Sequence, residues 1–184
     1  MSGFPNNSNV SIANFDGFTN QSSTALDIFD RRFATTSFAP PSGETLWSFF
    51  TPVQNFTANN ITMCTTGTAS AGLTLARMGL YSFNETTATL LAQTATDTAL
   101  FGITYQTFTR ALLSSVPLTA GTRYGVAVIQ VGTTPASILS NSPIPTTPLL
   151  TPRLLGFLTG QTDLTASATP TFNGLSISVF ARLT

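Results

Sequence analysis

Short strand-like runs separated by turn signals recur along most of this chain, and this pattern restricts the fold more than any other feature. Turn dipeptides such as Ala120-Gly121 and Asn173-Gly174 punctuate the runs. No stretch carries an apolar stripe of helical period long enough for a major helix. The pattern predicts an all-β fold, an antiparallel β-sandwich of jelly-roll type with about eight strands. The predicted strands are Thr45–Phe50, Asn60–Thr65, Leu73–Phe83, Thr89–Ala95, Phe108–Leu113, Arg123–Val131, Leu154–Leu158 and Leu175–Leu183.

The first part of the chain lacks this periodicity. Residues 1–44 are rich in Asn, Ser, Thr, Phe and Pro, and Pro40-Pro41-Ser42-Gly43 closes the segment as a strong breaker. We therefore predict an extended N-terminal arm over residues 1–44, followed by a jelly-roll sandwich over 45–184. A disordered leader is the alternative, but six phenylalanines are many for a solvated tail, and we expect them to dock on a neighbouring subunit. These are Phe4, Phe15, Phe18, Phe29, Phe33 and Phe38.

Two predicted strands are apolar on both faces. In Arg123–Val131, Val126 and Val128 lie on one face while Ile129 and Val131 lie on the other, and Leu73–Tyr81 is similar. An antiparallel strand buried on both sides needs a cover beyond its partner sheet. A second copy of the protein would supply it, so we expect a homo-oligomer, with a trimer as first choice. A cover from the chain's own arm or loops is an equally open alternative.

The last predicted strand has the opposite character. Along Leu175–Leu183 apolar residues alternate with Ser176, Ser178, Phe180 and Arg182. This alternation predicts one core face and one mostly solvated face.

The residue types absent from the chain exclude most catalytic chemistry. The sequence has no His, no Lys and one Cys, which rules out Ser-His and Cys-His dyads, Schiff-base chemistry, a P-loop lysine and a zinc site built from Cys and His ligands. The acids are scattered, so we expect no enzyme, no cofactor and no metal. Calcium at Asp16-Gly17 or Asn84-Glu85 is a weak alternative, because neither has ligand spacing.

The charge pattern also excludes two classes of partner. Formal net charge is zero, with seven Arg against seven acids and no basic cluster, so no nucleic-acid partner is expected. No apolar run approaches the roughly 20 residues that span a bilayer, so no membrane insertion is expected. Residues 1–7 have neither a basic start nor an apolar stretch, and no signal peptide is predicted. We expect the chain to be made and kept in a cytoplasm until another process, for example cell lysis, exports it.

Three arginines fall in or beside predicted strands, where a charge needs a partner. They are Arg77, Arg123 and Arg182. We expect pairing with turn acids such as Asp97 or Asp163, or with strand-end carbonyls; binding of an acidic or sugar ligand is the alternative.

Two aromatic residues also have two interpretations. Trp47 with Phe49 would form a sugar-stacking platform if both were exposed, and this pair is the candidate ligand face. Core packing is the interpretation that we favour for Trp47.

Several segments, taken in order, resemble a known module. They are Leu46-Trp47-Ser48-Phe49-Phe50-Thr51-Pro52, Arg77-Met78-Gly79-Leu80-Tyr81, Thr96-Asp97-Thr98-Ala99-Leu100-Phe101, Leu118-Thr119-Ala120-Gly121-Thr122-Arg123-Tyr124, Pro152-Arg153-Leu154, Gly160-Gln161-Thr162-Asp163-Leu164 and Ala181-Arg182-Leu183. Their order and spacing resemble a module of minor tail proteins from tailed bacteriophages that infect actinobacteria. The resemblance covers about residues 45–184 and brings no catalytic or ligand residues.

The resemblance implies a virion structural protein, located in the virion, with other virion proteins as partners and a role in host contact. Relatives often carry the module within a longer chain, so the place on the particle stays open. A minor tail protein is the first hypothesis, and a capsid decoration or head-associated protein is the second. A carbohydrate-binding module for host-surface glycans is the third.

Overall fold

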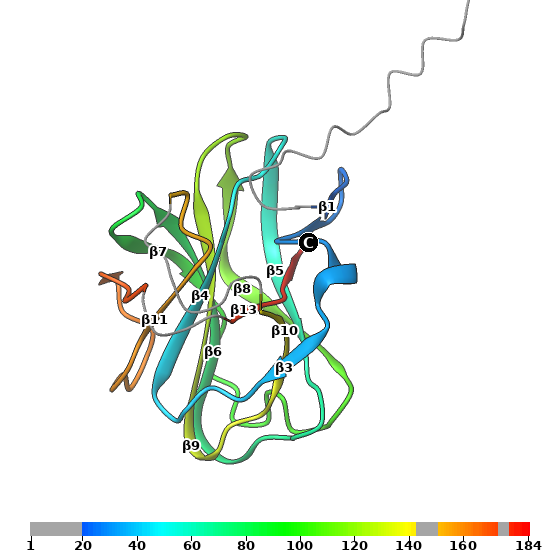
Figure 1. The fold of residues 1–184 in the computed structure, drawn as a ribbon, viewed down its shortest axis with the longest axis vertical. Helices are drawn as coiled ribbons and strands as arrows, with labels where there is room; N and C mark the ends of the chain where they lie inside the picture. Colours follow the sequence, from blue (N-terminus) through cyan, green and yellow to red (C-terminus); the bar gives the residue numbers. More distant parts are fainter. Residues whose placement is uncertain (1–19, 143–150, 173–176) are drawn as a thin grey trace, which may run out of the picture.

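The computed structural model describes residues 20–142, 151–172 and 177–184, and all structural statements below concern these residues. They form strands and one short helical turn, and no helix among them is long and apolar enough to cross a membrane. The predicted all-β antiparallel sandwich is confirmed (Figure 1). The elements are β1 (Asn20–Gln21), β2 (Leu26–Asp27), η1 (Arg31–Phe33), β3 (Thr36–Phe38), β4 (Glu44–Phe50), β5 (Phe56–Cys64), β6 (Ala71–Phe83), β7 (Ala88–Gln93), β8 (Thr107–Leu118), β9 (Tyr124–Thr134), β10 (Ile138–Asn141), β11 (Leu155–Leu158), β12 (Ser167–Ala168), β13 (Ser178–Val179) and β14 (Arg182–Leu183).

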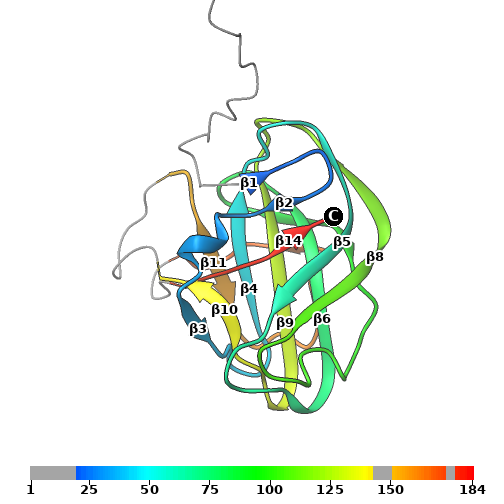
Figure 2. The same cartoon turned by 90° about the vertical axis from the view of Figure 1, so that its right-hand side faces the viewer.

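Two main sheets and one small sheet make the sandwich. The larger has the order β11-β4-β9-β6-β7-β12, and the second has the order β1-β2-β14-β5-β8, with its strands side by side in Figure 2. The small sheet is β13-β10-β3. The β5–β8 register shifts between Ala58 and Asn60, and β8 also bridges to the end of β7 through Leu112 and Thr94. This bridge joins the two main sheets along one side, so that they curl around the core.

The central strands β6 and β9 are buried on both faces, as the sequence predicts. Val126 and Val128 face the main core between the sheets, with no exposed surface. On the opposite face Ile129 is also fully buried, in a second core that includes Leu164 and Ala168 from the segment after β11. The cover is therefore intramolecular. The inference from two-sided apolar strands to a homo-oligomer loses its basis, because the chain's own loop supplies the second layer.

The N-terminal segment is part of the sandwich from residue 20 onward. β2 pairs with β14, and β3 pairs with β10. Leu26 and Ile28 lie in the main core with 0% and 2% of their surface exposed. Residues 20–44 therefore add strands to the chain's own sheets, and the core extends across the predicted boundary at residue 44.

The prediction of a solvated face along the last strand is wrong. Ser178 and Phe180 are both buried. The Ser178 hydroxyl donates to Ser48 Oγ at 2.9 Å, and the Phe180 ring meets Phe29 edge-on with 5.6 Å between ring centroids. Ser178 thus contacts β4, and the N-terminal segment covers Phe180, on a face that would otherwise meet water. Leu175 and Ser176 lie outside the described residues.

Candidate functional site

Trp47 and Phe49, the candidate ligand face, lie in the second core. They have 1% and 5% of their surface exposed. Trp47 packs edge-on against Tyr81, with ring centroids 5.6 Å apart, while Phe49 stacks on Phe83 with centroids 3.7 Å apart. A sugar ring cannot reach either side chain in this arrangement. Core packing, the interpretation favoured for Trp47, is what the structure shows.

Three of the six candidate arm residues are described, and they differ in burial. Phe29 and Phe38 are half-buried and pack against the main core of their own chain. Phe33, in η1, has 44% of its surface exposed. Phe4, Phe15 and Phe18 lie outside the described residues.

The three strand-associated arginines all have protein partners. Arg77 pairs with Asp163 at 3.2 Å, as one of the sequence-based expectations has it. Arg123 lies 3.1 Å from Glu85 and also donates to the backbone carbonyl of Arg153. Arg182 forms a two-pronged contact with Asp27, with nitrogen–oxygen distances of 2.6 and 2.9 Å. These contacts join elements far apart in the sequence, so the structural interpretation of the arginines holds.

Asp97 has a structural partner of its own. It accepts two hydrogen bonds from Arg110, at 2.8 and 2.5 Å, and one from the backbone N–H of Ala99 at 2.9 Å. Partial burial raises the pKa of this carboxyl, but the bonds from Arg110 and Ala99 outweigh that effect and hold the pKa below its usual value. The carboxylate therefore stays ionised and occupied, which suits fixing a loop and does not suit proton transfer.

The suggested calcium loop at Asn84-Glu85 is also committed to protein contacts. The Asn84 side-chain oxygen accepts from the backbone N–H groups of Thr86 and Thr87 at 3.2 and 2.7 Å. Both Glu85 oxygens are engaged, one by Arg123 and the other by the backbone N–H of Arg153. Within the described part of the chain no group of three potential metal ligands occurs. Asp16 lies outside the described residues.

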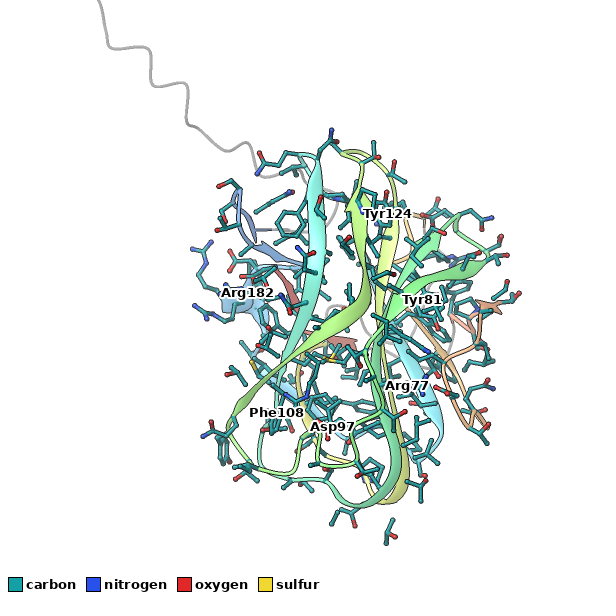
Figure 3. All side chains as sticks on the ribbon, turned by 180° about the vertical axis from the view of Figure 1, so that it is seen from behind. Arg77, Tyr81, Asp97, Phe108, Tyr124 and Arg182 are labelled. Atoms are coloured by element: carbon teal, nitrogen blue, oxygen red, sulfur yellow. The ribbon has the colours of Figure 1, made fainter. Side chains whose placement is uncertain are left out.

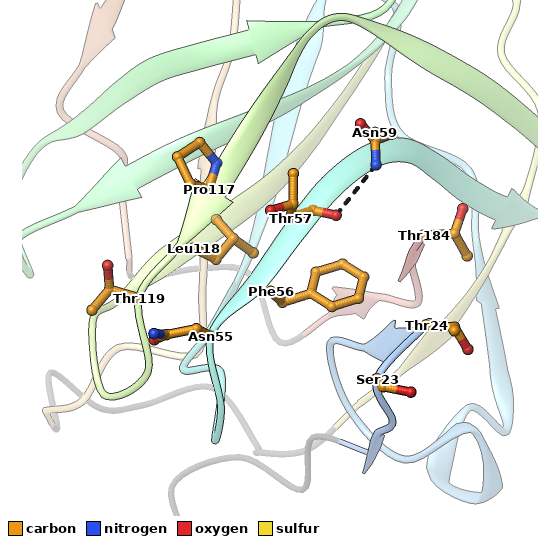
Figure 4. Close-up of a pocket in the computed structure, with 10 residues that line it drawn as sticks. All are labelled: Ser23, Thr24, Asn55, Phe56, Thr57, Asn59, Pro117, Leu118, Thr119 and Thr184. Carbon is orange, nitrogen blue, oxygen red and sulfur yellow. Dashed lines mark hydrogen bonds between the residues drawn. The ribbon is translucent and has the colours of Figure 1, made fainter.

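An open groove at one end of the module is the candidate site that sequence reasoning missed. Its walls come from Ser23–Thr24, Asn55–Thr57, Asn59, Pro117–Thr119 and Thr184, and its volume is about 580 Å³ (Figure 4). Most of these side chains carry hydroxyl or amide groups, and none is ionisable. The lining comes from segments far apart in the chain, so no contiguous sequence motif indicates the groove.

Comparisons with known proteins assign the chain to no group. No protein-family model matches the sequence, and no curated protein matches it.

Proposed function

We propose that this chain is a non-enzymatic structural protein of a bacteriophage particle, a minor tail protein on the particle surface that acts through its shape and contacts. The proposal is supported by the contacts of the segments that resemble the tail-protein module. Their polar side chains join parts of the sandwich to one another. Figure 3 shows Arg77, Asp97, Tyr124 and Arg182 spread across the module and not gathered at one place.

Two of these segments hold each other. The guanidinium of Arg77 pairs with Asp163, and the Tyr81 hydroxyl donates to the backbone carbonyl of Thr165 at 3.1 Å. Both contacts fasten the segment after β11 over the second core. A third segment closes its own turn, because the Tyr124 hydroxyl accepts a hydrogen bond from the backbone N–H of Thr119 at 3.0 Å.

Arg182 makes the longest-range connection among these segments. Its partner Asp27 lies at the other end of the sequence and has 3% of its surface exposed. A charge this deeply buried is tolerated only with a partner and hydrogen bonds. The Arg182–Asp27 contact therefore fastens the last strand to the N-terminal segment. A protein that works by its shape depends on contacts of this kind.

The decisive experiment is on the intact particle. Particles purified from an infected host culture should contain the chain, as detected by mass spectrometry. A cryo-EM map should place copies of the sandwich on the outer surface of the tail. Density on the capsid would replace the tail assignment with a decoration role, and absence of the chain from purified particles would overturn the proposal.

A further inference from the structure

We propose that the groove between the β1–β2 turn, the start of β5 and the end of β8 is a binding site for a neutral saccharide. This inference names a ligand class for the surface contacts of the proposed tail protein, and its biological meaning rests on that proposed function. The binding itself is a property of the isolated chain.

The groove presents hydrogen-bonding groups without protein partners among the described residues. The Asn55 side-chain oxygen accepts from the backbone N–H of Ala120 at 2.9 Å, which leaves the Asn55 amide NH₂ group for a ligand. The Asn59 NH₂ group makes a long contact of 3.4 Å to the carbonyl of Thr57, which leaves the Asn59 carbonyl oxygen as an acceptor. Thr57 and Thr119 also line the groove, and each carries a hydroxyl. Such a mixture of donors and acceptors matches sugar hydroxyls, each of which donates and accepts.

The groove also has a small apolar floor. Its exposed part is the Pro117 ring, while Phe56 and Leu118 belong to the main core and show only 8% and 2% of their surface. Figure 4 shows the Phe56 ring directed between β5 and Thr184. A pyranose ring has an apolar C–H face beside its hydroxyl rim, so an apolar floor bordered by polar groups is complementary to it.

The absence of ionisable side chains in the lining favours a neutral ligand. None of the residues that line the groove has a side chain that carries charge. A carboxylate or phosphate would lose part of its hydration here without gaining an opposite charge. A neutral saccharide has no such cost.

The walls are fixed before any ligand arrives. The backbone N–H groups of Asn59 and Asn60 both donate to the Thr184 carbonyl at 2.8 Å. In the β1–β2 turn the N–H of Ser22 donates to the Ala25 carbonyl, also at 2.8 Å. A preformed site avoids the entropy loss of ordering its walls on binding.

The test is a titration of the ¹⁵N-labelled full chain, followed by NMR. The probes are the methyl glycosides of D-glucose, D-galactose, D-mannose and N-acetyl-D-glucosamine, with D-glucuronate as a charged comparison. At least one neutral sugar should shift the backbone amides of Asn55–Asn59 and Ala120 saturably, with a Kd on the order of 1–10 mM because the groove is open. Shifts confined to other surfaces, equal binding of glucuronate, or no response to any neutral sugar would overturn the site.

Matched variants separate a groove effect from a general one. Thr57→Val keeps a β-branched side chain but removes the hydroxyl, and Asn59→Ala removes the amide. Each should weaken binding by roughly two- to tenfold, the worth of a single hydrogen bond. Thr107→Val, the same substitution at another exposed position at the other end of β8, should leave the affinity unchanged. Unchanged binding by both groove variants would contradict the assignment. A negative titration would remove the sugar site but leave the particle experiment unaffected.

Discussion

One carboxylate oxygen of Glu85 lies 3.1 Å from Nε of Arg123, and the other accepts a hydrogen bond from the backbone N–H of Arg153 at 2.8 Å. One carboxylate thus joins the β6–β7 turn, the start of β9 and the segment that leads into β11. Glu85 adopts a φ of 72°, a left-handed conformation uncommon for residues other than glycine. The surrounding contacts therefore hold this residue in place.

Glu85→Gln should lower the free energy of unfolding, because it removes the negative charge that faces Arg123. The Arg123 side chain is only 13% exposed, so water cannot fully replace that charge. We expect a loss of about 1–3 kcal/mol in urea denaturation. Asp30→Asn is the control, since Arg32 in that pair has 86% of its side chain exposed and solvent screens the interaction. Equal effects of the two substitutions would contradict a special role for Glu85.

Asp27→Asn should loosen the N-terminal segment from the last strand. It weakens the contact with Arg182 that accompanies the β2–β14 pairing. Because Asp27 is buried but 37% of the Arg182 side chain is exposed, we expect a loss of roughly 2–3 kcal/mol. Hydrogen exchange should speed up at Ile28, whose N–H donates to the Ala181 carbonyl, before it does so in β6. Uniform acceleration across all strands would argue against a local joint.

Glu44→Gln should stabilise the protein at neutral pH. Burial raises the pKa of the Glu44 carboxyl above its usual value of 4.5, and its Oε1 atom has no hydrogen-bond partner. The folded state therefore binds the proton more tightly than the unfolded state. Protonation of Glu44 therefore stabilises the folded state. This stabilisation is complete below pH 4.5 and is lost as the pH rises through the raised pKa of the folded state. The variant should gain about 1 kcal/mol at pH 7, and its difference from wild type should shrink toward low pH.

Asp97→Asn should change stability with pH in the opposite direction to Glu44→Gln. The pKa of Asp97 is held below its usual value of 3.8, so its contribution is present above pH 3.8 and is lost as the pH falls through the folded pKa. This variant should be less stable than wild type at pH 7 and should approach it under acidic conditions. The same pH trend for both variants would refute the assignment.

Leu164→Ala should destabilise the second core without any change in subunit association. Leu164 has 7% of its surface exposed and covers the outer face of β6 and β9 together with Ala168. Its truncation should cost about 2–4 kcal/mol. Light scattering should give the same mass for variant and wild type at equal concentration. A fall in mass without loss of stability would instead place Leu164 in a contact between subunits.

Deleting residues 1–19 should leave a folded sandwich that no longer enters particles. The deleted segment carries Phe4, Phe15 and Phe18, and burial of each on a neighbouring subunit of the proposed particle would contribute about 1.5–3 kcal/mol. Deleting residues 1–40 is a different experiment, since it also removes β2 and β3. Circular dichroism and particle incorporation should therefore separate the two truncations. Normal incorporation of the shorter truncation would remove the assembly role of these phenylalanines.

The strands that dominate the fold were the easiest to predict. β4, β6 and β9 are long, rich in β-branched and aromatic residues, and bounded by turn signals. β10 was missed because Ile138–Asn141 is short and half polar, and its only strong cue is its pairing with β3 and β13. Two-residue strands such as β1 and β2 are defined by tertiary pairing, which local propensity cannot supply. The predicted strand Leu175–Leu183 contains β13 and β14, which belong to different sheets.

The predicted ligand face failed for a related reason. Trp47 and Phe49 share a strand face, but the sequence does not reveal that the segment carrying Leu164 and Phe172 folds over it. The groove was missed because its lining comes from both ends and the middle of the chain. The ion pair between Arg77 and Asp163 was predictable, since both residues need partners and the acids are few.

The position of β14 has a consequence for synthesis on the ribosome. In the second sheet β14 lies between β2 and β5, so Arg182 and Leu183 occupy a slot flanked by strands made much earlier. Leu26 and Asp27 therefore cannot pair with β14 until most of the chain has been translated. Long-range pairing of this kind slows folding because loop closure precedes the contacts that stabilise it. Until translation reaches β14, the sheet has a missing strand between two unsatisfied edges, and a chain that pauses late is exposed there to pairing with other nascent chains.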